Sequence, residues 1–312
     1  MTFSTKVKEE ICSEEISRVD AIAELSAILR YDASITKNNI TLTFEQGSVA
    51  RRVFKDFKTI FNITPHIIVR NQKRLRAKQI YILEIKRNVS NLLHNLNMLK
   101  NDVLIPMNRD VLVTPEEMMS YVRGTFLVTG SVSDPSTSGY HLEYVFVQKQ
   151  DADFINELLH EMKFDSKVLE RGNRYIVYLK SSEEISDMIR MFRASQSLFY
   201  FEDIRIYRDH KNMVNRLNNC ELANQEKTTV TGMKQIEDIE YLKNNDLLDL
   251  LDEKTKIVME YRLKYPESSF QELADIIASE TDYRIGKSGI NHHFIKMKKL
   301  IQQHKLVDNN KK

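Results

Sequence analysis

The chain has 312 residues, of which 42% are hydrophobic and 29% charged, and its formal net charge is +2 at pH 7. This composition is typical of a soluble globular protein, and the length predicts two domains with room for a third small module. Because the net charge is close to zero, it does not indicate a polyanionic partner. Only local clusters of basic residues can do so.

Two cysteines, Cys12 and Cys220, lie far apart in the sequence. They provide neither a disulfide framework nor a set of metal ligands, which is typical of a reducing compartment. The segment Met1–Ile16 lacks the continuous apolar region of a signal peptide, and no apolar run is long enough to cross a bilayer. We therefore expect a cytoplasmic protein with no membrane contact, no metal and no cofactor.

The N-terminal part predicts a short helix and then a first set of helices and strands. The short helix is expected at Phe3–Glu15, and Asp20–Tyr31 has the apolar spacing of a core helix. The following segments are predicted to be a strand at Ile40–Phe44, a helix at Ser48–Phe61, strands at His66–Arg70 and Gln79–Ile85, and a helix at Val89–Leu99.

A second set begins after a polar, proline-containing connection that ends at Thr114. Thr114 is a candidate N-cap and Pro115 occupies a favoured first helical position, so a helix is predicted from there until Gly130. The following segments are predicted to be a strand at Tyr140–Val147, a helix at Ala152–Met162, strands at Lys167–Glu170 and Arg174–Leu179, and a helix at Glu183–Phe192.

The two sets form an internal repeat, because their elements follow in the same order. When Ser34 is aligned with Ser131, Ala27 falls on Gly124 and Asp32 falls on Thr129. Both core helices therefore carry a small residue in the middle of an apolar face. Glycine inside a helix costs roughly 1 kcal/mol relative to alanine, so we expect another helix to approach closely at Gly124.

A basic segment lies between two predicted strands of the first set. Arg70–Lys78 contains no acidic residue and is predicted to be a hairpin loop. Such a loop is either a solvated turn or a contact for the phosphates of a nucleic acid. Its candidate backbone contacts are Arg70, Lys73, Arg74, Arg76 and Lys78.

Further polar residues follow in the second set. His141 and Glu143 lie on the same face of a predicted strand, where we favour a surface polar pair over a metal pair. Another strand is predicted at Phe201–Tyr207, and Gln235–Asn244 is predicted to be a helix. The basic residues near that strand form either a DNA-facing rim or ordinary surface: Arg205, Arg208, His210, Lys211 and Arg216.

The C-terminal segment predicts three short helices. The first is expected at Lys254–Lys264. The second begins after a cap at Ser268 or Ser269, and the third begins after Ser288. Short helices joined by a tight connection, the last of them basic, are typical of a helix-turn-helix. The last helix is basic, since Tyr283–Val307 contains six Lys or Arg residues and no acid.

This last helix is the candidate recognition helix, because such helices place their N-terminal residues in the major groove. Asparagine can read adenine there and lysine can read guanine. The alternative is a plain three-helix module with a solvated basic face. The candidate DNA-binding residues are Arg284, Lys287, Ser288, Asn291, His292, His293, Lys296, Lys298 and Lys299.

Two segments resemble the helices of the LAGLIDADG homing endonuclease fold: LSAILRYDA at Leu25–Ala33 and VRGTFLVTG at Val122–Gly130. Nearly the whole chain resembles the bacterial WhiA family of transcription regulators, through GTFLVTGSVSDP, GYHLE, RYIVYLK, NRLNNCELAN at Asn215–Asn224, QIEDIE and KSGINHH. The resemblance implies an α+β fold, in which a duplicated αββαββα saddle domain precedes an all-α helix-turn-helix domain. It also implies a regulator linked to sporulation, cell division and chromosome segregation, with most of the DNA binding in the C-terminal domain.

Nuclease chemistry in that fold needs a carboxylate at the end of each core helix, so that Mg²⁺ is held between them. The two positions here are Asp32 and Thr129, and the neutral hydroxyl of Thr129 is a poor ligand for a hard cation. Asp134 lies beyond the following turn and is no obvious replacement. We therefore predict that the chain is not an enzyme; the alternative is an active or residual metal-dependent DNA endonuclease.

The chain is interpreted as a nucleoid-associated, sequence-specific DNA-binding transcription regulator. Its predicted organisation is a LAGLIDADG-like domain at 1–217, with repeats at about 20–100 and 115–200, a linker with a bridging helix at 218–250, and a helix-turn-helix domain at 251–312. Double-stranded DNA is the expected partner, and RNA polymerase or a sigma factor is a candidate partner. A second alternative is an adaptor that binds a sigma factor or a division protein.

Overall fold

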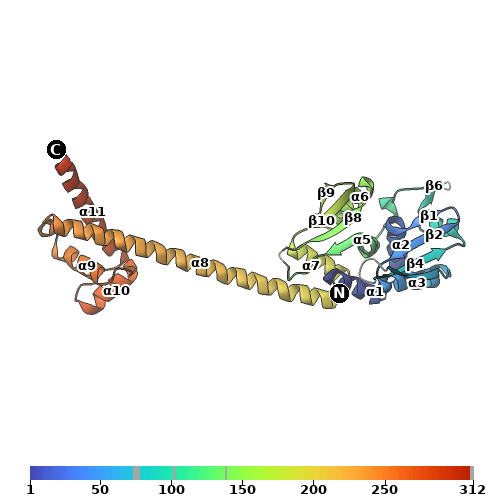
Figure 1. Ribbon diagram of the computed structural model, residues 1–312, viewed down its shortest axis with the longest axis horizontal. Helices are drawn as coiled ribbons and strands as arrows, with labels where there is room; N and C mark the ends of the chain where they lie inside the picture. Colours follow the sequence, from blue (N-terminus) through green and yellow to red (C-terminus); the bar gives the residue numbers. More distant parts are fainter. Residues whose placement is uncertain (73–77, 101–102, 138, 310–312) are drawn as a thin grey trace. The chain divides into compact units, whose positions relative to one another are not determined.

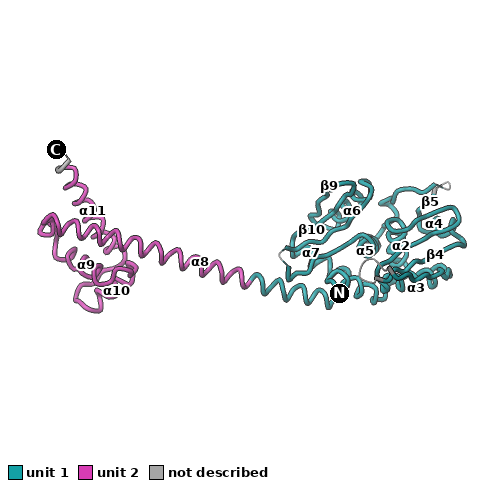
Figure 2. The backbone as a smooth tube through the Cα atoms, viewed as in Figure 1, with its two compact units in different colours: residues 1–209 teal, residues 210–312 magenta. Residues whose placement is uncertain are grey.

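The computed structural model describes residues 1–72, 78–100, 103–137 and 139–309. The chain forms two compact units, Met1–Asp209 and His210–Lys312 (Figure 2). The boundary between them lies inside a long helix and comes earlier than the expected end of the first domain at residue 217. In the described part of the chain, no helix combines the length and the apolar character that crossing a bilayer requires.

The first repeat contains the predicted elements (Figure 1). They are α1 (Phe3–Ser13), α2 (Arg18–Asp32), β1 (Ser34–Thr36), β2 (Asn39–Phe44), α3 (Gly47–Phe61), β3 (His66–Gln72), β4 (Lys78–Ile85) and α4 (Val89–Asn95). Ser17 caps α2, because its Oγ accepts a hydrogen bond from the Asp20 N–H at 3.1 Å. Asn62 ends α3 in the left-handed conformation, with a φ of 53°.

The second repeat has the same order of elements. It is preceded by β5 (Leu99–Lys100), β6 (Val103–Leu104) and a 3-10 turn, η1 (Arg109–Val111). It consists of α5 (Pro115–Thr129), β7 (Gly130–Val132), β8 (Leu142–Phe146), α6 (Lys149–Glu161), β9 (Lys167–Arg171), β10 (Arg174–Leu179) and α7 (Ser182–Met191). Thr114 and Glu117 form a capping box ahead of Pro115, so the predicted start of this helix is confirmed.

Each repeat builds one four-stranded antiparallel sheet. The strand orders are β1-β2-β4-β3 and β7-β8-β10-β9, so the two sheets have the same topology. Their registers also correspond, because Ser34 pairs with Thr41 in the first sheet and Ser131 pairs with Glu143 in the second. These features confirm the duplicated αββαββα fold.

The two repeats meet through the helices α2 and α5, which pack side by side within one shared hydrophobic core (Figure 1). A Cβ atom placed on Gly124 would lie 2.4 Å from the backbone oxygen of Glu24. A larger residue would therefore push the two helices apart. The equivalent small residue of α2, Ala27, is fully buried. The close approach predicted at Gly124 is confirmed.

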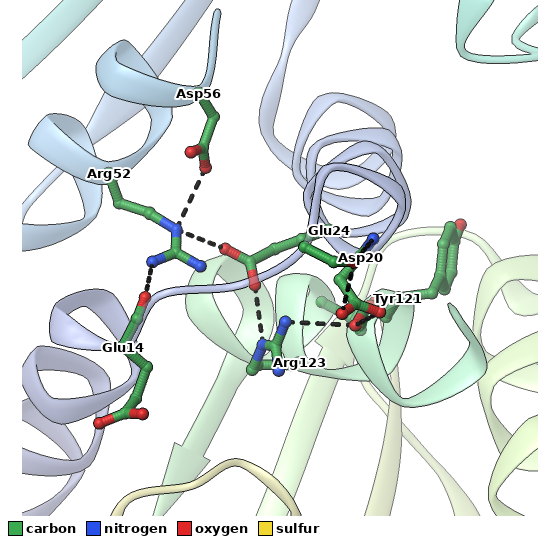
Figure 3. Close-up of polar contacts among 10 residues, drawn as sticks. Glu14, Asp20, Glu24, Arg52, Asp56, Tyr121 and Arg123 are labelled. Atoms are coloured by element: carbon green, nitrogen blue, oxygen red, sulfur yellow. Dashed lines mark hydrogen bonds and ion pairs between the residues drawn. The ribbon is translucent and has the colours of Figure 1, made fainter. Parts of the chain in front are cut away.

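A buried network of ion pairs joins α2, α3 and α5 at the same place (Figure 3). The fully buried Glu24 accepts a hydrogen bond from Arg123 Nε at 2.8 Å and lies 3.2 Å from Arg52 Nε. Arg52 also pairs with Asp56 at 3.1 Å and donates to the backbone oxygen of Glu14. Because an unpaired charge inside a protein is strongly destabilising, the network favours one register between the two repeats.

Helix α8 (Ser195–Asn244) begins in the first unit and ends in the second. It includes Phe201–Tyr207, so the strand predicted there is wrong. Phe201 is fully buried, and its ring lies 6.3 Å from the ring of Phe3 on α1. This packing outweighs the strand preference of the aromatic and β-branched residues in the segment. The helix also continues through most of the expected linker 218–250.

The second unit is helical and has its own hydrophobic core. After α8 it contains the 3-10 turn η2 (Leu248–Leu250) and the helices α9 (Glu253–Lys264), α10 (Phe270–Glu280) and α11 (Lys287–Asn309). A capping box of Ser269 and Glu272 starts α10, as the sequence predicts. Val258, Leu273 and Phe294 bring α9, α10 and α11 into this core. The expected all-α helix-turn-helix domain is confirmed.

We expect Gly124→Ala to lower the free energy of unfolding by about 1–3 kcal/mol, since the new methyl group meets backbone atoms that cannot move aside. Denaturation in urea, followed by circular dichroism, measures this change. Gly139→Ala is the matched control, because no atom lies within 4 Å of a Cβ atom there, and its effect should stay within about 0.5 kcal/mol. Equal stabilities of the two variants would contradict the close approach of α2 and α5.

We expect Arg123→Met to cost about 3–5 kcal/mol of stability, because it leaves Glu24 buried without one of its cations. Adding Glu24→Gln should recover part of this loss, since the buried charge is then removed. A double-mutant cycle of unfolding free energies measures the coupling. Strictly additive losses would show that the two side chains do not stabilise each other.

Candidate nucleic-acid interface

Helix α11 has a buried side and an exposed side. Ile290, Phe294, Met297 and Ile301 are buried and recur every three or four residues. The exposed residues on the opposite side recur with the same spacing, so they share one surface. We call this surface the α11 face, and it consists of Ser288, Asn291, His292, Ile295, Lys298 and Lys299.

Two predicted residues of α11 make contacts within the domain. His293 Nδ1 lies 2.8 Å from Thr255 Oγ1, and its Nε2 lies 3.0 Å from the Tyr283 hydroxyl. Burial lowers the pKa of His293. Lys296 Nζ donates to the carboxylate of Asp252, which caps α9. These contacts tie α11 to the rest of the domain. Lys296 is nevertheless exposed, and contacts of His293 and Lys296 with DNA stay a prediction.

Arg284 and Lys287 lie beside the α11 face. Arg284 is exposed, and its Nη1 donates to the backbone oxygen of Ala278 near the end of α10. Lys287, the first residue of α11, is also exposed and lines a pocket together with residues of α8 and of the α9–α10 connection. Arg284 therefore precedes the face, whereas Lys287 lies at its N-terminal edge, four residues before Asn291.

The sequence reasoning missed Ile295. This hydrophobic side chain is 44% exposed and lies on the α11 face between Asn291 and Lys299. An exposed apolar group in the major groove can contact the methyl group of thymine. The signal that would have found it is its spacing of four residues from both Asn291 and Lys299.

The basic hairpin of the first unit is partly described. β3 and β4 pair in an antiparallel register that runs from His66–Glu84 to Gln72–Lys78, which confirms the predicted hairpin. Arg70 is exposed on β3. Lys73, Arg74 and Arg76 lie outside the described residues. Contacts of this hairpin with phosphates remain a prediction.

The central strands of the two sheets carry a different kind of surface on the side turned away from the core. In β4, Ile80, Ile82 and Glu84 alternate with buried residues, and in β8 Glu143 and Val145 do the same. Arg70, Lys167 and Arg171 lie on the outer strands β3 and β9, and Arg174 is the first residue of the central strand β10. The middle of the outer faces therefore carries mainly apolar, hydroxyl and acidic side chains.

The ends of α2 and α5 hold the two positions where the endonuclease fold carries carboxylates. Asp32 Oδ2 accepts a hydrogen bond from the Thr43 N–H at 3.0 Å, and burial raises the pKa of Asp32 to about 6. Thr129 Oγ1 donates to the backbone oxygen of Thr125 at 3.0 Å, within its own helix. Both side chains are therefore engaged in local hydrogen bonds.

A cavity of about 310 Å³ beside Asp32 does not fit a divalent cation. Its lining carboxylates are Asp32 and Glu45, and Lys8 lines it as well. Burial lowers the pKa of Lys8 to about 8, so its amine is mostly charged at neutral pH and repels a cation. Across the described residues, no three His, Cys, Asp or Glu side chains are grouped as metal ligands.

Three other polar residues noted in the sequence have local roles. His141 Nε2 and Glu143 Oε2 are 3.0 Å apart, and Glu143 also accepts from Ser131 Oγ at 3.1 Å. Asp134 accepts hydrogen bonds from the N–H and the hydroxyl of Ser136, at 2.9 and 2.6 Å, and so stabilises a turn. The His141–Glu143 pair is therefore explained by strand pairing, and Asp134 is explained by turn formation.

The fold defines the class of protein: a duplicated LAGLIDADG-like domain followed by a helix-turn-helix domain. Family models match the chain in the same three parts. They are the WhiA N-terminal LAGLIDADG-like domain at residues 18–99, the WhiA LAGLIDADG-like domain at 118–211 and the WhiA C-terminal HTH domain at 214–301.

Relatives of similar length support the same assignment. The probable cell division proteins WhiA of Bacillus velezensis and Bacillus subtilis are 36% and 35% identical over 309 residues, and the match covers 97% of each chain. A crystal structure of full-length DUF199/WhiA from Thermatoga maritima matches with a TM-score of 0.58 and 23% identity, over 97% of this chain and 99% of that one. The chain belongs to the WhiA family.

We expect Asp32→Asn to stabilise the protein at neutral pH. The pKa of Asp32 is about 6 in the fold, against 3.8 for the free side chain, so the folded state holds the proton more tightly and loses stability as pH rises through this window. Asparagine removes this cost and keeps an acceptor for Thr43. The difference in unfolding free energy between variant and wild type should grow from near zero at about pH 4 to about 1–3 kcal/mol at pH 7. Urea denaturation at several pH values measures this difference. A difference that does not change with pH would contradict the burial of Asp32.

Proposed function

We propose that this protein binds double-stranded DNA sequence-specifically through α11 and regulates transcription without cutting the DNA. The observation that carries the proposal is the α11 face, which presents hydrogen-bonding, apolar and basic side chains together on one exposed helix side. Asn291 is suited to adenine, Ile295 to the thymine methyl group, and Lys299 to guanine or a phosphate. In this proposal the protein is cytoplasmic and associated with the nucleoid.

The first unit has a non-catalytic role in this proposal. Asp32 and Thr129 make local hydrogen bonds, and Lys8 lines the cavity beside Asp32. Its hairpin with Arg70 adds contacts to the DNA backbone, which do not depend on sequence.

A protein partner for the first unit is a second candidate function. The middle of the outer sheet faces carries Ile80, Ile82 and Val145 rather than basic residues, and apolar surface of this kind favours protein contacts. Candidate partners are RNA polymerase, a sigma factor or a division protein. Since the relatives are named probable cell division proteins, we place the regulated processes in cell division, with chromosome segregation and sporulation as related ones.

We expect Asn291→Ala to weaken binding to the protein's own DNA site by about 1–3 kcal/mol, because a bidentate contact to a base is lost. Genome-wide crosslinking identifies the site, and fluorescence anisotropy measures the affinity. Binding to an unrelated duplex should change little. Gln303→Ala, at an exposed position one helical turn beyond Lys299, the last residue of the α11 face, is the neutral control.

Wild-type affinity of Asn291→Ala for the site would show that α11 does not read it. The same duplex incubated with the protein and Mg²⁺ or Mn²⁺ should remain uncut. Nicking that disappears in Asp32→Asn would overturn the non-catalytic role of the first unit.

A further inference from the structure

A pocket of about 200 Å³ lies in the second unit, where α8, the α9–α10 connection and the start of α11 come together. Among its lining residues are three cations and four hydroxyl groups, and none of the lining residues is acidic. We call it the Arg262 pocket, and it is lined by Lys227, Thr228, Thr231, Arg262, Ser268, Ser269, Phe270 and Lys287.

Arg262 is a buried cation without an acidic partner. Arg262 is 1% exposed, and its guanidinium lies 5.8 Å from the ring of Phe270 and 5.7 Å from the ring of Phe294. Nη1 donates to three backbone oxygens, those of Tyr265, Pro266 and Ser268, whereas Nε is buried and has no hydrogen-bond partner. Within the described residues, Arg262 forms no ion pair with a carboxylate. Because a buried charge without a counter-charge is costly, this arrangement indicates an anion that binds from outside.

Helix α8 supplies one wall of the pocket through a close backbone contact. A Cβ atom on Gly232 would lie 2.1 Å from the backbone oxygen of Pro266, so α8 lies directly on the α9–α10 connection. Lys227, Thr228 and Thr231 lie on the turn of α8 before this contact. The position of their side chains in the pocket therefore depends on glycine at 232.

The donors that remain for an anion are the amines of Lys227 and Lys287 and the hydroxyl groups of Thr231 and Ser268. Thr228 Oγ1 donates to the backbone oxygen of Asn224 at 2.9 Å. Ser269 Oγ accepts from the Glu272 N–H at 3.2 Å and also hydrogen-bonds the Glu272 carboxylate, so it belongs to the capping box of α10. Glu272 does not supply the missing counter-charge to the pocket. Its carboxylate accepts from the Ser269 N–H at 2.7 Å, and the residue lines a different cavity.

We propose that the Arg262 pocket binds a phosphate group. Guanidinium, ammonium and hydroxyl groups are the donors that phosphate oxygens accept. Where this phosphate belongs to DNA, the proposal rests on the function proposed above. Lys287 directly precedes Ser288 of the α11 face, so a backbone phosphate held here sets the register of α11 in the groove. The same donor groups can also bind the phosphate of a free phosphorylated small molecule. Lys287 is thereby assigned to a phosphate rather than to a base edge.

The test compares Lys227→Gln and Thr231→Val with Lys234→Gln, which removes an exposed charge from α8 outside the pocket. Arg262 is left unchanged, because its burial makes a folding defect the expected result of substitution. In the first arm, the full chain is titrated with duplex DNA at several salt concentrations. Lys227→Gln should weaken binding roughly five-fold for all sequences and reduce the slope of log Kd against log salt by about 1.

In the second arm, inorganic phosphate replaces chloride at constant ionic strength, and thermal unfolding is followed. Phosphate should raise the Tm of the wild type and of Lys234→Gln, and should raise it less in Lys227→Gln and Thr231→Val.

A change in the first arm alone assigns the pocket to a DNA phosphate, and a change in the second arm alone assigns it to a free phosphorylated ligand. Changes in both arms support the shared chemistry. No difference from Lys234→Gln in either arm overturns the proposal. A wild type that binds no DNA contradicts the proposed function, and the phosphate arm still decides the role of the pocket.

Discussion

The backbone contact between Gly124 and Glu24 determines how the first unit is assembled. Because residue 124 has no side chain, α5 lies directly against the backbone of α2. The side chain of Glu24 is then fully enclosed and requires the cations of Arg123 and Arg52. One residue thus provides both the contact surface between the repeats and the charge that favours a single register. The close backbone contact and the buried ion pairs favour the same arrangement of the two helices. Agreement between separate interactions of this kind specifies a unique fold.

This scaffold does not depend on the chemistry that its fold supports elsewhere. The contact lies in the middle of the helix pair, whereas Asp32 and Thr129 lie at the helix ends. Asp32 accepts a hydrogen bond from the backbone of β2, and Thr129 donates one within α5. These two hydrogen bonds are separate from the contact at Gly124. The retained acid has a structural partner, and the neighbouring cavity carries the amine of Lys8.

In the second unit, polar residues are divided between holding the domain together and facing outward. His293 and Lys296 connect α11 to α9 through Thr255 and Asp252. Arg262 joins α9 to the segment before α10 through three backbone oxygens and lies beside the stacked rings of Phe270 and Phe294. Residues one turn away on α11 remain exposed. The same helix therefore supplies both internal hydrogen bonds and an exposed surface, because its two sides have different surroundings.

The sequence by itself determined the duplicated fold, the close helix contact at Gly124, the caps at Thr114 and Ser269, and the helix-turn-helix. These features are encoded by spacing and by residue type over a few turns of chain. Tertiary structure alone decided that Phe201–Tyr207 is helical, because Phe201 is buried against Phe3. It also decided that His293 points inward and Ile295 outward, since neighbouring helices cover one side of α11. The Arg262 pocket is of this second kind: its residues come from three separate segments, and no local pattern specifies that they meet.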